Sequence, residues 1–327
     1  MPEWLVEKGI GESRAALVDA GRIVEVRIQL EGTLPAGTVI EAGLIDCGTH
    51  GRNGVARSSR GTEFLLPFVP RELTEGQEIR IEITRSPIPG SEPWKRPLAK
   101  ATLHDPTRPR SLAGQLRKAG EEVRELTFPG SADELGEAGW NDLLEEARSG
   151  AIPFPDGSLG LFVTPAMTLI DVDGRLPPAE LMVRGAEAAA RSIRRLDVGG
   201  SIGIDFPTAG SKAARQQAAE AIDSILPQPF ERTAVNGFGF VQIVRPRSRA
   251  SLLELAQDRA GFEARALLRR VAFEPAGPNR LVAHPAVIRL LEGKPTWIEA
   301  LARQAGGEIS LRADAALPMS GGYAEKA

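Results

Sequence analysis

The stretch MTLIDVDGR (167–175) decides how the chain is interpreted. Apolar residues dominate its first half, which predicts a buried strand, yet Asp171 and Asp173 stand at its end. Residues two apart on a strand point to the same face. Two neighbouring carboxylates repel unless something positive separates them, so a metal ion, an arginine or water is expected beside them.

The segments around this stretch alternate between strands and helices. Proline opens the first of the two expected helices and arginines close it, as is typical of helix ends. Strand, helix, strand, helix, strand is the order of an α/β layer. The predicted elements are a strand pair in 157–173, helices at 177–196 and 211–226, and strands at 198–207 and 237–247.

A second acid follows the next apolar strand of this layer, because GSIGIDF (200–206) ends in Asp205. One long helix separates it from Asp171, which predicts a crossover between parallel neighbouring strands. Ligands of such sheets gather at the carboxyl ends of strands, so Asp171, Asp173 and Asp205 are expected in one crevice. Oxygen ligands favour Mg²⁺ or Mn²⁺, which phosphodiester hydrolases use. Alternatively, the acids hold an arginine or cap helices, and Asp173 starts a turn.

Basic residues of the same layer are candidate phosphate contacts, because arginine is the preferred fork for phosphate. The alternative is ordinary charge on solvated surfaces. The helix segment ARSIRRL (190–196) adds Arg191, Arg194 and Arg195, and for Arg191 and Arg194 the solvated-face interpretation is favoured. The candidates retained for nucleic-acid contact are Arg245, Arg247, Arg249 and Lys212.

The N-terminal part predicts mainly short strands rather than alternating strands and helices. Residues 14–30 predict a hairpin, and short strands between glycines and prolines in 37–88 predict a small barrel. Within the barrel segment, Phe64 could stack a nucleic-acid base, although a core phenylalanine is the alternative. Residues 108–150 are charged and mostly helical in pattern, and 281–314 predict a small α+β unit.

Composition excludes several classes of protein. A chain of 327 residues predicts two or three domains. No apolar run approaches the roughly 18 residues of a membrane span, and the acidic N-terminal segment is not a secretory signal, so a cytoplasmic protein is expected. A single cysteine, Cys47, rules out an internal disulfide and a cysteine-cluster metal site. The net charge of −3 does not by itself indicate nucleic-acid binding.

Several motifs, in order, resemble those of the ribonuclease E/G family. FPDGSLGLFVTPAMTLIDVDGR (154–175) is similar to the family's stretch leading to its first metal-binding aspartate, here Asp171. ARSIRRLDVGGSIGIDF (190–206) is similar to the stretch leading to the second, here Asp205. Further matches cover the opening hairpin (14–28), the basic segment with Arg249 (245–257) and the end of the catalytic half (284–314), and a weaker match covers the exit from the barrel (76–103).

This resemblance implies a Mg²⁺-dependent endoribonuclease that acts on single-stranded RNA, with the two aspartates holding the metal that activates water. It also implies the fold. An RNase H-like layer would comprise 1–34 and 106–150, interrupted by an S1-like barrel at 35–105. A DNase I-like catalytic layer would comprise 151–265, followed by a small α+β domain at 266–327.

The chain also departs from the family pattern. The cysteines of the family's zinc link are absent, so we expect no zinc and a homodimer rather than a zinc-linked tetramer. The 5′-sensor domain has no counterpart. Asp173 stands where the family usually has asparagine, and the acid that usually follows the second aspartate is missing. Two alternatives therefore stay open: an RNA-binding relative without turnover, and a DNase or structure-selective nuclease.

Overall fold

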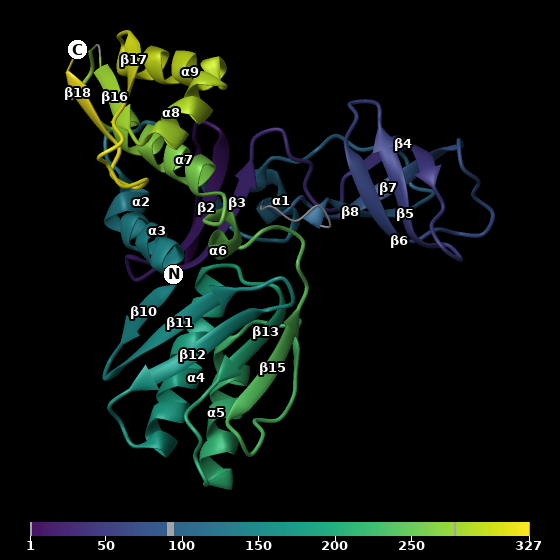
Figure 1. Cartoon of the computed structure of the whole chain (residues 1–327), viewed down its shortest axis with the longest axis vertical. Helices are drawn as coiled ribbons and strands as arrows, with labels where there is room; N and C mark the ends of the chain where they lie inside the picture. The colour runs from purple at the N-terminus through teal and green to yellow at the C-terminus, as the bar shows by residue number, and fades with distance from the viewer. Residues whose placement is uncertain (1, 90–94, 278, 327) are drawn as a thin grey trace.

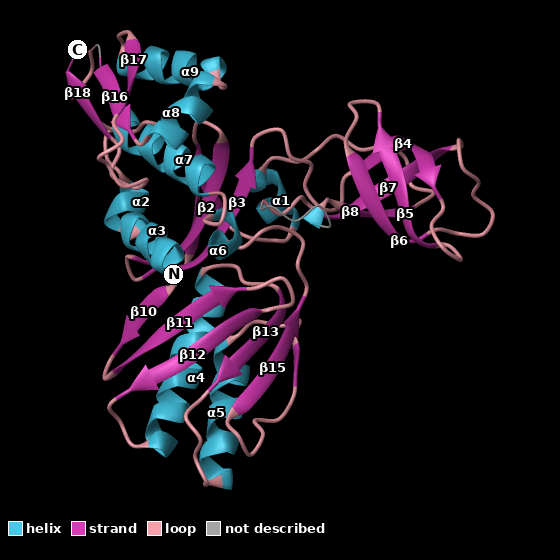
Figure 2. Ribbon diagram, in the orientation of Figure 1, coloured by secondary structure: helices cyan, strands magenta, loops and turns pink. Residues whose placement is uncertain are grey.

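The computed structural model describes residues 2–89, 95–277 and 279–326. It is a mixed α/β structure in which three sheets and a closed barrel are linked by helices (Figures 1 and 2). In Figure 1 the barrel projects to one side of the body formed by the sheets and their helices. Among the described residues, none of the helices combines the length and apolar character that crossing a membrane requires.

The first sheet is formed mainly by the N-terminal segment and has the strand order β3-β2-β1-β9. The predicted hairpin is confirmed as β2 and β3. The strand β1 was not predicted, and it pairs antiparallel with β2 and parallel with β9. Helix α1 packs its leucines on one face, against Trp4 and Val6. The bounds are β1 (Glu3–Lys8), β2 (Glu12–Asp19), β3 (Arg22–Leu30), β9 (Val123–Leu126) and α1 (Leu112–Lys118).

The predicted barrel is confirmed and is closed, with the strand order β4-β5-β6-β8-β7. It lies between β3 and β9 in the sequence, so it is inserted into the first sheet's chain path. Within the segment matched to the family's barrel exit (76–103), residues 90–94 lie outside the described residues. The strands are β4 (Val39–Asp46), β5 (Arg52–Ser58), β6 (Glu63–Phe68), β7 (Glu78–Arg85) and β8 (Leu98–Ala101).

The base-stacking role predicted for Phe64 is corrected by this barrel. Its side chain is 1% exposed and packs in the barrel core with Leu44, Leu66 and Ile81. A ring enclosed in this way presents no face to a nucleic-acid base. Phe64 sits on the inward side of β6, which is why the alternative interpretation as a core residue holds.

The second sheet has six strands in the order β10-β11-β12-β13-β15-β14. The predicted crossover is confirmed: β12 and β13 are parallel neighbours joined through α4. Helix α5 lies beside α4, and both helices cover the same side of the sheet (Figure 1). The bounds are β10 (Ala151–Phe154), β11 (Gly157–Val163), β12 (Thr168–Gly174), α4 (Pro178–Arg195), β13 (Gly200–Asp205), α5 (Lys212–Ile225), β14 (Glu231–Arg232) and β15 (Phe240–Arg245).

The alternation of side chains in this sheet creates one buried and one open face. Ile170 and Val172 on β12, and Ile202 and Ile204 on β13, are buried on the side of the helices. The residues between them point to the opposite side. No helix of the described chain covers that side in Figure 1, and we call it the open face.

The C-terminal part forms a third sheet, β17-β16-β18, packed with α7, α8 and α9. The predicted domain boundary between 265 and 266 falls inside the continuous helix α7. The remaining bounds are α2 (Glu134–Glu137), α3 (Trp140–Ser149), α6 (Leu252–Leu255), α7 (Arg259–Ala272), β16 (Asn279–Ala283), α8 (Pro285–Glu292), α9 (Pro295–Ala305), β17 (Ile309–Ala313) and β18 (Tyr323–Lys326).

A buried ion network fastens helix α7 to the first sheet. Arg269 donates to Glu7 on β1, with Nε 3.0 Å from Oε1, and also to Asp133. Arg265 donates to Glu12 on β2 at 2.9 Å. Arg14, at 1% exposure, bridges the two glutamates. Buried charges are tolerated only when paired, so this network fixes the position of the C-terminal part.

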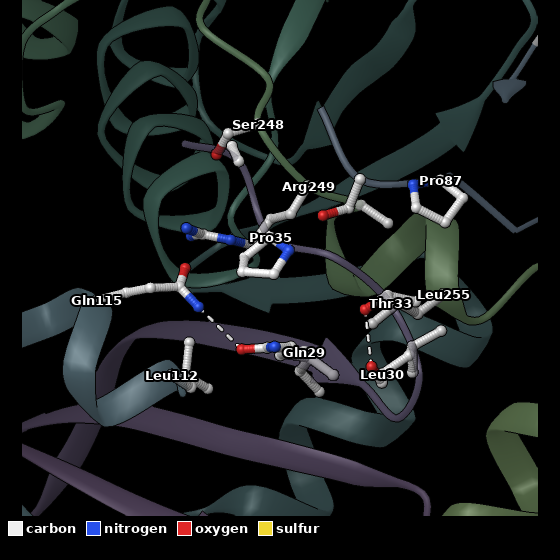
Figure 3. Close-up of a pocket in the computed structure, with 14 residues that line it drawn as sticks. Gln29, Leu30, Thr33, Pro35, Pro87, Leu112, Gln115, Ser248, Arg249 and Leu255 are labelled. Atoms are coloured by element: carbon white, nitrogen blue, oxygen red, sulfur yellow. Dashed lines mark hydrogen bonds between the residues drawn. The ribbon is translucent and has the colours of Figure 1, made fainter. Parts of the chain in front are cut away.

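The barrel joins the body at a small cavity, which Figure 3 shows. Pro35 on the segment that enters the barrel and Pro87 on the β7–β8 connection both line it. The Ser86 amide donates to the Ser248 carbonyl at 2.9 Å, which ties the β7–β8 connection to the segment after β15. Below it, Gln115 of α1 donates to Gln29 of β3 at 2.8 Å (Figure 3).

Candidate metal and nucleic-acid site on the open face

Two acids of the predicted site meet across neighbouring strands. Asp171 on β12 and Asp205 on β13 are register partners in the parallel pair, near the carboxyl end of each strand. Asp173 lies two residues further along β12 and therefore on the same face. All three side chains are exposed on the open face rather than enclosed in a crevice.

The electrostatics of these acids follow from their spacing. Partial burial, together with the charges of Asp173 and Asp205, raises the pKa of Asp171 above its ordinary value. The repulsion is therefore felt at Asp171, and a cation placed between the carboxylates would relieve it. The three acids therefore share one small region of negative charge, next to which the sequence analysis expects a metal ion, an arginine or water.

The donor set fits a hard divalent cation. The side chains offer oxygen ligands, and Mg²⁺ typically takes one or two carboxylates while keeping several waters. The Asp171–Asp205 pair meets that requirement. Across the described ranges, no group of three or more histidine, cysteine, aspartate or glutamate side chains forms a ready-made cage for a metal. Any metal held here would rely on two protein ligands together with water or phosphate oxygens.

Phenylalanines beside the acids were missed by the sequence analysis. Phe240 on β15 is the register partner of Asp205. Its ring lies over Gly203, where an added Cβ would come within 2.6 Å of the ring. Phe162 on β11 is 56% exposed and pairs with Leu169 on the same open face. The alternation of side chains in GSLGLFV, together with its pairing to MTLIDVD, would have predicted Phe162 on the same face as Asp171.

The predicted cations separate into two places. Lys212 begins α5, which follows β13, so it lies toward the end of the strand that carries Asp205, and its side chain is exposed. Arg245 is the register partner of Gly200 at the other end of β13. Five residues separate Gly200 from Asp205, a rise of about 16 Å along a strand. Arg175, which the sequence analysis did not single out, is exposed directly after β12.

Protein groups pair with the three arginines at the end of β15 and just after it. Arg245 donates to the Val198 carbonyl at 2.8 Å, and burial lowers the pKa of its guanidinium. Arg247 donates to Glu254 at 3.0 Å. Arg249 donates to Asp197 at 3.2 Å. A role for Arg245, Arg247 and Arg249 in RNA binding stays a prediction, but each has a structural task here.

Comparisons with known proteins add no relative to this picture. No family model matches the chain, and no curated protein is significantly similar to it.

Proposed function

We propose that the chain is a Mg²⁺-dependent endoribonuclease that cleaves single-stranded RNA on the open face. The observation that carries the proposal is the register pairing of Asp171 with Asp205 beside Asp173. Two carboxylates held this close on an exposed surface suit a divalent cation and a phosphodiester better than a structural role. The motif resemblance to the ribonuclease E/G family supports the same assignment.

Under this proposal each part of the fold has a task. The six-stranded sheet would be the DNase I-like catalytic layer, and the first sheet the RNase H-like layer. The closed barrel would be an S1-like module that holds RNA beside them. Its insertion between β3 and β9 supports the assignment, because the family resemblance implies an inserted barrel at this point of the chain.

Asp171 and Asp205 would hold the metal, with Asp173 adding negative charge next to them. When bound, Mg²⁺ supplies Lewis-acid stabilisation of phosphoryl charge and lowers the pKa of a coordinated water; Mn²⁺ could replace it. Phe162, which is exposed, and Phe240, which is partly buried over Gly203, lie on either side of the acids and could stack unpaired bases. Lys212 would contact a phosphate. Stacking on these rings favours single strands, because the bases of a duplex are already stacked on each other.

A second candidate function is RNA binding without cleavage, by a cytoplasmic protein that resembles the ribonuclease E/G family. The arrangement of cations favours it: Arg245, Arg247 and Arg249 pair with protein groups and lie near the Gly200 end of β13. An RNA strand bound near these arginines would not need to pass over Asp171 and Asp205. This candidate keeps the barrel as the RNA-binding part.

A cleavage assay on three labelled strands separates these candidates. Single-stranded RNA, single-stranded DNA of the same sequence and double-stranded RNA are incubated with the protein in Mg²⁺ or in EDTA. The proposal expects Mg²⁺-dependent cleavage of the single-stranded RNA alone. Binding without cleavage would favour the second candidate, and cleavage of the DNA strand would favour a DNase.

A further inference from the structure

A pocket of about 540 Å³ lies on the side of the second sheet opposite the open face. Strand β3 of the first sheet, strand β10 and the C-terminal turns of α4 and α5 enclose it. Its volume is within the range typical of small-molecule sites. Asp171 and Asp205 do not line it, so it is separate from the proposed catalytic site.

Four arginines line this pocket, and the described lining includes no carboxylate. Arg191, Arg194 and Arg195 come from the last turns of α4, and Arg22 comes from the start of β3. The sequence analysis favoured a solvated face for Arg191 and Arg194. The fold instead places a fourth arginine, from a segment about 170 residues away, at the same cavity.

Carboxylates outside the lining hold the α4 arginines in place. Glu25 on β3 accepts from Arg194 Nε at 3.3 Å, and Glu146 on α3 accepts from Arg195. Arg191 has one long contact, 3.4 Å to Glu187. Each guanidinium carries five N–H donors, so a single carboxylate contact leaves most of them for a ligand. Arg22 has an exposed side chain and makes no ion pair within the described chain.

The rest of the lining is mostly apolar, with Ser192 and Ser224 as its uncharged polar residues. Ile23 on β3 and Ile152 on β10 are buried at its base, and Phe154 lies beside them. The ring of Phe154 rests on Gly157, where an added Cβ would come within 2.3 Å of it, so the ring's position is fixed. The pocket therefore combines a floor for a planar apolar body with a rim of phosphate-binding forks.

We propose that this pocket binds a nucleoside monophosphate, with the base on the Phe154 side and the phosphate among the arginines. Arginines at the C-terminus of a helix are common because they complement its dipole, and that alone would explain Arg194 and Arg195. It does not explain Arg22 on β3 or an apolar cavity of this size. The proposal goes beyond ribonuclease activity and does not depend on it.

The test is calorimetric titration of the full chain, without Mg²⁺ or RNA, using AMP, adenosine and inorganic phosphate as probes. We expect AMP to bind more tightly than either fragment. Arg191→Ala should weaken AMP binding at least tenfold while leaving the thermal unfolding midpoint unchanged, because the side chain is 65% exposed. Phe154→Ala should weaken AMP binding but leave phosphate binding unchanged.

The matched control is Arg184→Ala. Arg184 lies on the same helix, is 59% exposed and also faces Glu187, at 4.0 Å, but does not line the pocket. AMP affinity should be unchanged in this variant. Three results would overturn the proposal: no AMP binding by the wild type at millimolar concentration, equal loss in Arg184→Ala and Arg191→Ala, or adenosine binding as tightly as AMP. None of them bears on RNA cleavage, which is measured separately.

Discussion

Asp171 on β12 and Asp205 on β13 stand directly opposite each other in a parallel strand pair, on the face that the helices leave open. Neighbouring strands lie about 4.8 Å apart, so the two carboxylates cannot avoid each other's charge. The crossover through α4 produces this pairing, because it returns the chain to the adjacent strand in the same direction. A small region of negative charge on the open face follows from the topology, and the proposed divalent cation would bind there.

We predict that Asp171→Asn raises the unfolding temperature of the metal-free protein at pH 7. The pKa of Asp171 is raised in the folded protein, so between its ordinary and its raised value the folded state binds more protons than the unfolded state. Stability is therefore lost as pH rises through this window, and the loss persists above it. Thermal unfolding at pH 7 and near pH 3 checks this, since the gain should vanish at the lower pH.

The control for that measurement is Asp19→Asn, because Asp19 is an exposed acid at the tip of the β2–β3 hairpin. It should show no comparable gain. A fall in the midpoint of Asp171→Asn at pH 7 would mean that Asp171 has a favourable partner in the metal-free protein.

Mg²⁺ should make the wild type more stable than the Asp171→Asn variant, which is the reverse of the order predicted without metal. Anything that binds only the folded state stabilises it, so Mg²⁺ should raise the unfolding temperature of the wild type. The Asp171→Asn/Asp205→Asn protein should show no rise, and Asp173→Asn a smaller rise than wild type. Differential scanning fluorimetry across a Mg²⁺ titration measures this. Equal rises in wild type and double variant would place the cation elsewhere.

Phe162→Ala should weaken binding of single-stranded RNA by between about 5- and 150-fold, because stacking on an aromatic ring contributes roughly 1–3 kcal/mol per base. The ring is 56% exposed, so stability should be unaffected. Fluorescence anisotropy of a labelled RNA gives the affinity. Tyr323→Ala serves as the control, because Tyr323 is an exposed aromatic on β18 in the C-terminal sheet. Parallel losses in both variants would remove Phe162 from the site.

Arg269→Ala should destabilise the chain by at most about 3–5 kcal/mol, because it removes one of the two arginines that pair with the buried Glu7 and leaves only Arg14 beside it. Asp133 loses the same partner; although burial opposes its ionisation, the Arg269 guanidinium holds its pKa below the usual value. Denaturant unfolding measures the loss. Arg259→Ala, at the exposed start of the same helix, should change stability by less than about 0.5 kcal/mol. A small effect of Arg269→Ala would mean that the C-terminal part is held by its apolar contacts.

Local patterning predicted the elements that build the site. The alternation in MTLIDVD, the helix at 177–196 and the apolar run before Asp205 each indicate their own structure, and a crossover of that length admits essentially one arrangement. The pairing of Asp171 with Asp205 was therefore accessible from the sequence. So was the barrel, because short strands between glycines and prolines mark it, whereas its insertion was implied only by the family resemblance.

Long-range pairing set the limits of sequence reasoning. EWLVEK (3–8) is a short strand whose partners include β9, about 120 residues later, and no local pattern reveals that contact. Arg265 and Arg269 resemble surface charges of a helix until Glu12 and Glu7 meet them. The same applies to Arg22 and Arg191, which only the packing of β3 against α4 brings to one pocket.

Cleavage of a labelled single-stranded RNA in Mg²⁺ by wild type and by Asp171→Asn/Asp205→Asn, side by side on a denaturing gel, tests the central claim most directly. Both proteins are first shown to be folded by thermal unfolding. We predict Mg²⁺-dependent cleavage by the wild type and none by the double variant, while RNA binding through the barrel is retained. Cleavage by the double variant at the wild-type rate would contradict the assignment of these two aspartates as the metal-holding residues.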